Sequence, residues 1–216
     1  MSAARHPVQF QGSGLARWIL ARLGWQVLFE GLPGKQGVIV VYPHTSNWDF
    51  PIGLLAKWAI GIPVFFWGKD SLFTLPLLGR WMRWVGGLPV DRRSPQGVVE
   101  STAAQLLQAR AEDRLMWLAL APEGTRSLTS GWRSGYYRLC VQTGLPLGLA
   151  DLDWGRRQVR VMDFVQLSGD PALDYAMLAR HYDGVRGYHP QQASPVQPIA
   201  SPNRPPAGDP SHGPGL

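Results

Sequence analysis

The chain has 216 residues, a length that fits one domain with a sizeable buried core and excludes a peptide-sized disulfide scaffold. Apolar residues make up 45% of it and charged residues only 17%, which excludes a chain that is disordered or fibrous as a whole. The net charge of +6 and the pI near 9.9 point to a polyanionic partner, which could be nucleic acid, an anionic membrane face or a phosphorylated substrate.

Residues 1–35 are predicted to form an amphipathic segment that associates with a membrane. Between Leu15 and Phe29 the apolar residues recur at helical spacing, and Arg17 and Arg22 stand among them, a pattern typical of a helix lying in a membrane interface. A helix that simply covers the core is an equal alternative. Because the arginines interrupt any apolar run, a secretory signal is not expected.

The middle of the chain, residues 36–185, alternates between strand and helix patterns. We expect strands at residues 38–42, 64–67, 88–90, 115–120, 146–152 and 159–165. We expect helices at residues 48–60, 71–85 with a break near Pro76 and Gly79, 95–111, 135–143 and 172–182. This alternation predicts a single-domain α/β fold, a layered sheet flanked by helices.

Residues 186–216 are predicted to be a disordered tail. From His189 onward the chain holds eight of its 19 prolines and few apolar residues, so this stretch has little surface to bury in a core.

The aromatic residues and the positive charges concentrate in one region. Between Trp48 and Val90 charged residues interrupt the apolar runs long before the roughly 18 apolar residues of a spanning helix, so no transmembrane helix is predicted. Residues 67–93 carry five Lys or Arg against two Asp, among several tryptophans. Such a mixture suits a lipid headgroup region and predicts an anionic membrane surface as partner.

Cys140 is the only cysteine. A single thiol excludes an internal disulfide framework and a multi-thiolate metal site, and it favours a reducing compartment. Cys140 falls in the middle of a predicted helix without a nearby base, and no Gly-x-Ser-x-Gly motif occurs. Neither a reactive cysteine nor a serine nucleophile of this type is therefore indicated.

A candidate catalytic pair follows the first buried strand. His44 and Asp49 could not meet inside one regular helix, since five residues turn the chain by about 500°. They can meet if His44 lies in the loop and Asp49 in the first turn of the next helix, with Ser46 or Asn47 as N-cap. The carboxylate would then hold one imidazole nitrogen as N–H and leave the other as general base. The alternative is a pair that only caps the helix.

Two further loops follow predicted strands. One holds Glu123, Gly124 and Arg126, where glycine permits close backbone approach and arginine can bind a phosphate or carboxylate. The other holds Arg92 after the strand at 88–90. Ligands collect at the carboxyl ends of strands in open parallel sheets, so these loops are expected to converge with His44 on one crevice.

Four blocks in this order resemble the signatures of the glycerolipid acyltransferases, the 1-acylglycerol-3-phosphate (lysophosphatidic acid) acyltransferase family. Residues 44–49 resemble its His-x4-Asp signature, and residues 86–92, 122–126 and 145–147 resemble its second, third and fourth blocks. The resemblance covers residues 15–180. Pro89 departs from the aromatic or aliphatic residue usual there, and the short stretch after Arg126 resembles a compact bacterial subgroup.

The resemblance implies acyl transfer to a lyso-lipid hydroxyl. His44 would be the general base, oriented by Asp49, and the alkoxide would attack an acyl thioester directly. The acceptor and its phosphate would be bound by Arg92, Glu123, Gly124, Thr125 and Arg126, and Pro146 would line the acyl site.

The expected partners are a lyso-lipid acceptor, acyl-CoA or acyl-carrier protein as co-substrate, and an anionic membrane surface, with no cofactor, metal or nucleic acid. The expected location is peripheral, on the cytoplasmic face of the inner membrane. Two alternatives are a non-catalytic lipid-binding protein and a metal-dependent hydrolase with His44, Asp49 and Glu123 as ligands, which lacks a second histidine at ligand spacing.

Overall fold

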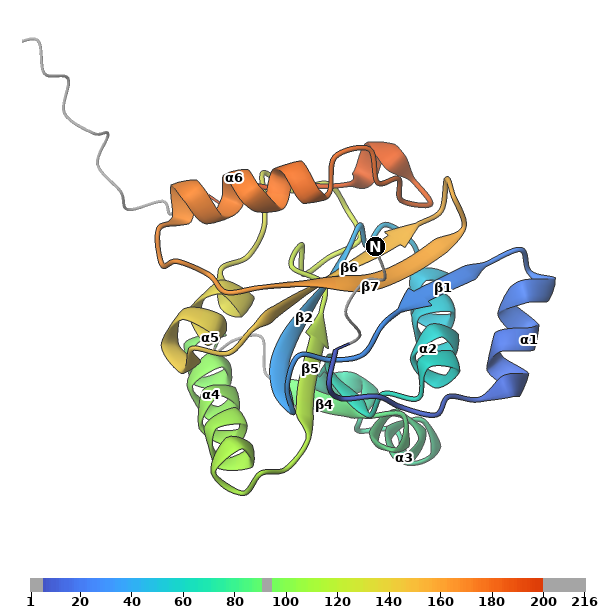
Figure 1. Ribbon diagram of the computed structural model, residues 1–216, viewed down its shortest axis with the longest axis horizontal. Coiled ribbons are helices and arrows are strands. Elements are labelled where there is room, and N and C mark those ends of the chain that lie inside the picture. Colours follow the sequence, from blue (N-terminus) through green and yellow to red (C-terminus); the bar gives the residue numbers. More distant parts are fainter. Residues whose placement is uncertain (1–5, 91–94, 200–216) are drawn as a thin grey trace, which may run out of the picture.

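The computed structural model describes residues 6–90 and 95–199, and its centre is one twisted sheet (Figure 1). The strands of this part of the chain are β1 (Gln26–Phe29), β2 (Gln36–Tyr42), β3 (Val64–Lys69), β4 (Gly87–Val90), β5 (Met116–Leu120), β6 (Leu147–Asp153) and β7 (Gln158–Val165). Their order across the sheet is β1-β7-β6-β2-β5-β3-β4.

The strand directions decide where the loops meet. β2 pairs in parallel with both β5 and β6, and β3 pairs in parallel with β4 and β5. β7 runs antiparallel to β6, and β1 is parallel to β7. The carboxyl ends of β2 to β6 therefore lie at one edge, and β2 and β5 are neighbours, so the loops after them lie side by side.

Helices cover both faces of the sheet (Figure 1). They are α1 (Gly14–Arg22), α2 (Asp49–Ile60), α3 (Pro76–Trp84), α4 (Pro95–Ala111), α5 (Gly135–Thr143) and α6 (Pro171–His181), with short 3-10 turns η1 (Asp70–Leu72) and η2 (Pro190–Gln192). Val38 and Val40 of β2 pack into a core with α4, α5 and α6, whereas Ile39 packs into a second core with α1 and α2. Burial on both faces explains why β2 reads as an uninterrupted apolar run.

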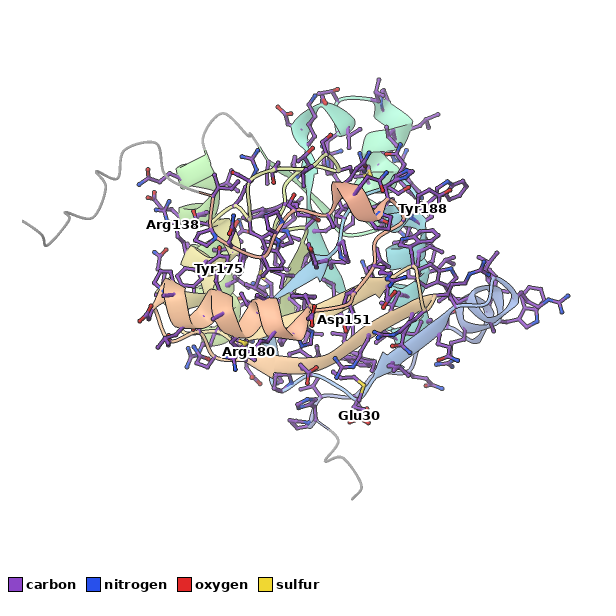
Figure 2. The ribbon with its side chains drawn as sticks, turned by 90° about the horizontal axis from the view of Figure 1, so that it is seen from above. Glu30, Arg138, Asp151, Tyr175, Arg180 and Tyr188 are labelled. Atoms are coloured by element: carbon purple, nitrogen blue, oxygen red, sulfur yellow. The ribbon has the colours of Figure 1, made fainter. Side chains whose placement is uncertain are left out.

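The last helix is fixed to the sheet by buried side chains. Tyr175 and Leu178 of α6 are buried in the first core. Near the end of α6, His181 Nε2 lies 2.8 Å from Oδ1 of Asp151 on β6. Figure 2 shows Asp151 beside this end of α6. α6 thus closes the face that α4 and α5 begin to cover.

The layered α/β fold is confirmed, and most expected elements match within a few residues. At the amino end the expected helix is too long: α1 ends at Arg22, and Gln26–Phe29 form β1 instead. Gly24 turns the chain with a φ of 75°, and the buried Trp25 packs edge-on against Trp154 with ring centroids 4.8 Å apart. The packing of Trp25 against Trp154 and the pairing of β1 with β7 thus outweigh the helical spacing of these residues.

α1 presents two different faces. Ala16 and Leu20 are buried against the core, as the covering-helix alternative requires. Leu15 and Trp18 on its other side are exposed. Helical spacing therefore reflects a helix that packs on the domain and also presents apolar surface.

The predicted break in the helix at 71–85 lies at Pro76, which begins α3. Gly79 does not break the helix. It lies inside α3, where a Cβ would come 2.4 Å from the Phe73 carbonyl oxygen, so its role is close packing.

The prediction of a disordered tail is wrong for residues 186–199, which fold against the domain and include η2. Ser194 in this stretch is fully buried. Its backbone groups bond to side chains of strand-end loops, which composition does not reveal because a proline-rich segment can be ordered by hydrogen bonds rather than by apolar burial. Residues 200–216 lie outside the described residues.

None of the helices in the described part of the chain combines the length and the apolar character that crossing a membrane requires.

Candidate active site

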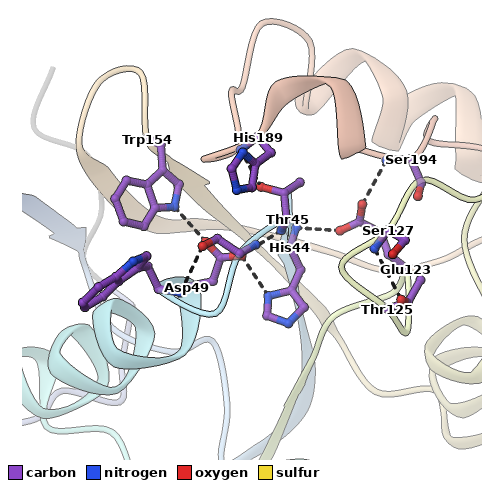
Figure 3. Close-up of polar contacts among 11 residues, drawn as sticks. His44, Thr45, Asp49, Glu123, Thr125, Ser127, Trp154, His189 and Ser194 are labelled. Atoms are coloured by element: carbon purple, nitrogen blue, oxygen red, sulfur yellow. Dashed lines mark hydrogen bonds and ion pairs between the residues drawn. The ribbon is translucent and has the colours of Figure 1, made fainter.

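His44 and Asp49 meet at the carboxyl end of β2 (Figure 3). His44 follows β2 in the loop, and Asp49 begins α2, which is the arrangement expected from their spacing. The His44 Nδ1 atom lies 3.1 Å from Oδ2 of Asp49, and the imidazole is 22% exposed while the carboxylate side chain is 1% exposed. The buried Asp49 carboxylate therefore holds the imidazole of His44, which remains accessible to solvent.

The Asp49 carboxylate is surrounded by donors. Its Oδ2 accepts the backbone N–H groups of Thr45 and Ser46, each at 2.8 Å, and its Oδ1 accepts the indole N–H of Trp154 at 2.8 Å (Figure 3). Burial raises the pKa of this carboxyl, but hydrogen bonds from His44, Ser46 and Trp154 outweigh burial and hold the pKa below its usual value. Asp49 is therefore ionised at neutral pH.

The expected N-cap is wrong. Trp48, not Ser46 or Asn47, occupies the cap position of α2, and it makes no side-chain cap hydrogen bond. The Ser46 hydroxyl accepts the Trp48 N–H at 3.2 Å. The Asp49 carboxylate itself reaches back to the loop amides, and so fastens the His44 loop to the first turn of the helix.

This geometry suits a general base. A carboxylate beside Nδ1 favours the proton on that nitrogen and stabilises the imidazolium that forms during proton transfer. The lone pair is then on Nε2 of His44, and it can accept the proton of a substrate hydroxyl.

Glu123 comes from the loop after β5 and is fully buried. Its Oε2 accepts the backbone N–H of His44 at 2.6 Å, and its Oε1 accepts the backbone N–H of Ser194 at 2.9 Å (Figure 3). Burial raises the pKa of this carboxyl, and the hydrogen bonds from Ser194 and His44 offset the rise only in part. Both carboxylate oxygens thus hold backbone groups of the site.

The rest of this loop forms a tight turn. Gly124 has a φ of 68°, and a Cβ there would come 2.4 Å from Nε of Arg133, so the position requires glycine. The Thr125 hydroxyl accepts the Ser127 N–H at 3.3 Å. Arg126 is exposed, and among the described residues no carboxylate lies within ion-pair distance of its guanidinium.

A polar pocket of about 410 Å³ lies beside these loops. Its lining residues are Thr45, Ser46, Asn47, Trp48, Arg126, Tyr188, His189 and Gln192. Arg126 is the cation in this pocket and can bind an anionic group there.

Of the other predicted site residues, Arg92 lies outside the described residues, and Pro146 is not brought to this centre. Pro146 precedes β6, and its carbonyl accepts the Val38 N–H at 3.1 Å. His44 follows the other end of β2, about 20 Å away at the rise of a strand. Pro146 is thus at the amino edge of the sheet, opposite His44 and Asp49.

Sequence reasoning missed Trp154 and Ser194, which bond to Asp49 and Glu123. Trp154 directly follows β6 at the same edge as His44, so the rule that functional residues follow parallel strands could have found it. Ser194 carries no comparable signal, because its segment is recognisable only by its prolines.

Cys140 is fully buried in α5. Burial raises the pKa of its thiol to about 12, which disfavours the thiolate that a nucleophile needs. Tyr136 and Tyr137 of α5 are both buried in the core. No group of three or more His, Cys, Asp or Glu residues in the described ranges is placed to hold a metal ion.

Comparison with known proteins gave two matches. A family model described as Acyltransferase matches residues 26–148, more than half of the chain. The crystal structure of the 1-acyl-sn-glycerophosphate (LPA) acyltransferase PlsC from Thermotoga maritima matches with a TM-score of 0.50 and 21% identity, covering 79% of this chain and 75% of that chain. The likeness to that structure shows a shared fold. Comparison with curated proteins gave no match.

Proposed function

Because the chain belongs to the acyltransferase family, we propose that it moves a fatty acyl chain from an acyl thioester to a hydroxyl of a lysophospholipid, with His44 as general base. The His44–Asp49 contact of 3.1 Å carries the proposal. The Thermotoga maritima protein that shares the fold is a 1-acyl-sn-glycerophosphate acyltransferase, which supports a phosphate-bearing lyso-lipid as acceptor.

The reaction needs two proton transfers and one exchange of bonds. Nε2 of His44 takes the proton of the acceptor hydroxyl while the hydroxyl oxygen attacks the thioester carbonyl. The carbon–sulfur bond then breaks, and the thiolate leaves with the proton returned from the imidazolium. Asp49 stabilises the imidazolium between these steps. The buried Cys140 gives no support for an acyl-enzyme.

The donor is acyl-CoA or acyl-carrier protein, since both present the thioester that this reaction needs, and no further cofactor is required. Arg92 and Arg126 are proposed to bind the acceptor phosphate. The exposed side chain of Arg126 in the polar pocket supports its part of this role.

The mechanism is tested with His44→Ala. Purified protein is incubated with acyl-CoA or acyl-carrier protein and a panel of lysophospholipids, and mass spectrometry identifies the products. Loss of the base is expected to lower the rate by about a hundredfold to ten-thousandfold. His181→Ala is the matched control, because it breaks a second His–Asp pair at 2.8 Å that the mechanism does not use. Full activity in folded His44→Ala protein would refute the mechanism.

We also propose that the protein binds an anionic membrane surface through α3. Leu77 and Trp84 on this helix are 83% and 74% exposed, and Arg80 and Arg83 beside them are also exposed. Apolar side chains can enter the interface while the arginines bind lipid phosphates. This combination supports a peripheral location on the cytoplasmic, anionic face of a bacterial inner membrane.

The apolar surface continues from α3 across α2 to α1. The Trp58 ring lies 6.0 Å from the Trp84 ring, and it also lines a hollow of about 450 Å³ together with Leu15 and Ile19 of α1. The helices α1, α2 and α3 lie on the same side of the domain (Figure 1). Each of them contributes apolar side chains to this surface.

Vesicle flotation tests this surface. Vesicles containing phosphatidylglycerol are expected to bind the protein more tightly than pure phosphatidylcholine vesicles, and Leu77→Glu is expected to weaken binding about tenfold or more. Leu173→Glu on α6 is the matched control, since Leu173 is 66% exposed on the opposite helical layer. Equal binding of the two variants would exclude α3 as the contact surface.

A further inference from the structure

The segment Arg186–Ile199, called the C-terminal strap below, crosses the edge of the sheet where His44 and Glu123 lie. It follows α6 and lies outside residues 26–148, which match the family model. η2 of the strap lies directly above the loop that holds Thr45 (Figure 3). The strap therefore reaches the site from a part of the chain that the family model does not include.

The strap is tied to the loop of the catalytic pair. The His189 N–H donates to the Thr45 hydroxyl at 3.1 Å. The NH2 group of Gln192 can donate to the Thr45 carbonyl at 3.1 Å and to the Arg126 carbonyl at 3.0 Å. Gly187 packs so closely that a Cβ there would come 2.6 Å from Oγ1 of Thr45.

A second set of contacts ties the strap to the loop after β5. The buried Ser194 donates its N–H to Glu123 at 2.9 Å, and its hydroxyl accepts the Thr129 N–H at 3.0 Å. Its carbonyl accepts the Tyr42 hydroxyl at 3.0 Å. Farther along, the Trp132 N–H donates to the Gln197 carbonyl at 2.7 Å.

We propose that the strap is part of the catalytic site, with Ser194 as a positioning residue that acts through Glu123 on His44. The Ser194 N–H binds Oε1 of Glu123, and Oε2 of Glu123 binds the His44 N–H. Two hydrogen bonds in series thus run from the strap to the backbone of the proposed base. The catalytic part of this inference rests on the proposed acyl transfer.

The physical reason is the burial of Glu123. A buried carboxylate that loses one of its donors is left short of a hydrogen bond at a high cost in free energy. It then shifts toward another donor or takes up a proton. Either change weakens its bond to the His44 N–H and loosens the loop that aims the imidazole.

The main test compares Ser194→Pro with Ser194→Ala. Proline removes the N–H, and the preceding Ala193 already has the extended conformation, with φ −66° and ψ 120°, that a residue before proline prefers. Alanine keeps the N–H and removes only the hydroxyl. The proline variant is expected to lower kcat about tenfold with the donor KM unchanged, and the alanine variant, which keeps the N–H, is expected to lower kcat less.

A second variant reaches the strap without changing Ser194. Gly187→Ala places a methyl group against Thr45 and is expected to lower kcat in the same way. Gly14→Ala is its matched control, because a Cβ at Gly14 meets no atom within 4 Å.

Hydrogen exchange at the amides of residues 44–46 is measured for all four variants, with thermal unfolding as a check of folding. Faster exchange and a larger loss of kcat in Ser194→Pro than in Ser194→Ala, and in Gly187→Ala than in Gly14→Ala, support the proposal. Unchanged kcat in folded Ser194→Pro protein, or an equal loss in Ser194→Ala, would overturn it. If the wild-type chain transfers no acyl group, the proposed function fails, and the exchange rates still decide whether the strap holds the loop.

Discussion

Asp49→Asn separates the electrostatic role of the carboxylate from the shape of the site. The substitution keeps the size of the side chain but replaces one oxygen by an NH2 group and removes the charge. In the native protein Oδ2 accepts two backbone N–H groups and faces His44, while Oδ1 accepts the Trp154 indole N–H.

No orientation of the asparagine amide satisfies these partners. With its oxygen toward the loop amides, the NH2 group meets the Trp154 N–H across a contact that is 2.8 Å in the native protein. With the amide turned over, the NH2 group meets the N–H groups of Thr45 and Ser46. Either way two donors face each other in a buried place, which costs about 1–3 kcal/mol and lowers the melting temperature by about 2–4 °C per kcal/mol at this chain length.

The effect on catalysis is expected to be larger than the effect on stability. Without the charge, the imidazolium of His44 loses its stabilisation, and with the amide turned over the NH2 group donates to Nδ1 and leaves the proton on Nε2. We expect kcat to fall by about a hundredfold to ten-thousandfold. Initial rates are measured at saturating lysophospholipid and acyl-CoA, well below the melting temperature of the variant.

Trp154→Phe serves as the control, since it removes one donor to Asp49 and keeps the charge. Its ring can still pack against Trp25 and Tyr188. Its kcat is expected to fall far less than that of Asp49→Asn. If Asp49→Asn retained kcat within the range of Trp154→Phe, the carboxylate would not act on the base, and the proposed role of the pair would be refuted.

Glu123→Gln is expected to lower the free energy of unfolding by about 1–3 kcal/mol in denaturant titrations, because its single carbonyl oxygen cannot accept both native N–H donors; stability equal to wild type would contradict the two contacts. Gly124→Ala is expected to destabilise the protein and reduce activity, since a Cβ collides with Arg133, and a variant as stable as wild type would disprove the tight turn. The folded pKa of Asp49 is lowered, so its contribution to stability is expected to be fully present above the usual pKa of 3.8 and to be lost as pH falls through the folded value. Acid unfolding of wild type and Asp49→Asn at a series of pH values measures this contribution. A stability difference between the two proteins that does not change with pH would contradict the expectation. The folded pKa of Glu123 is raised, so its contribution to stability has the opposite pH dependence. It is fully present below the usual pKa of 4.5 and is lost as pH rises through the folded value. Cys140, buried with a thiol pKa of about 12, is expected to resist iodoacetamide in the folded enzyme and to react after unfolding, whereas rapid labelling with loss of activity would show an accessible thiol.

The sequence predicted most of the sheet and the contact between His44 and Asp49 because both depend on local pattern. The apolar run of β2 predicts a buried strand whichever strands pair with it, since a strand covered on both faces is apolar throughout. The contact between His44 and Asp49 follows from five residues that turn from a loop into a helix, so their spacing was enough to predict it.

The local sequence pattern gave a wrong prediction at two places. Residues 26–29 have helical spacing, but pairing with β7 makes them a strand. There a tertiary contact outweighed a local preference of about 1 kcal/mol or less. The N-cap of α2 differs for a local reason: the Asp49 carboxylate accepts the N–H groups of Thr45 and Ser46 and takes the place of the usual capping side chain.

By itself, the sequence determined the layered α/β class, the place of His44 after a central strand and the partnership with Asp49. Only the tertiary structure decided that Glu123 holds the His44 backbone, that Trp154 supports Asp49, and that a proline-rich segment is folded across the site. These three contacts join residues 71 to 105 positions apart in the chain. Hydrogen bonds at such separations depend on which strand ends share an edge of the sheet, and that is set by the order of the strands rather than by any local pattern.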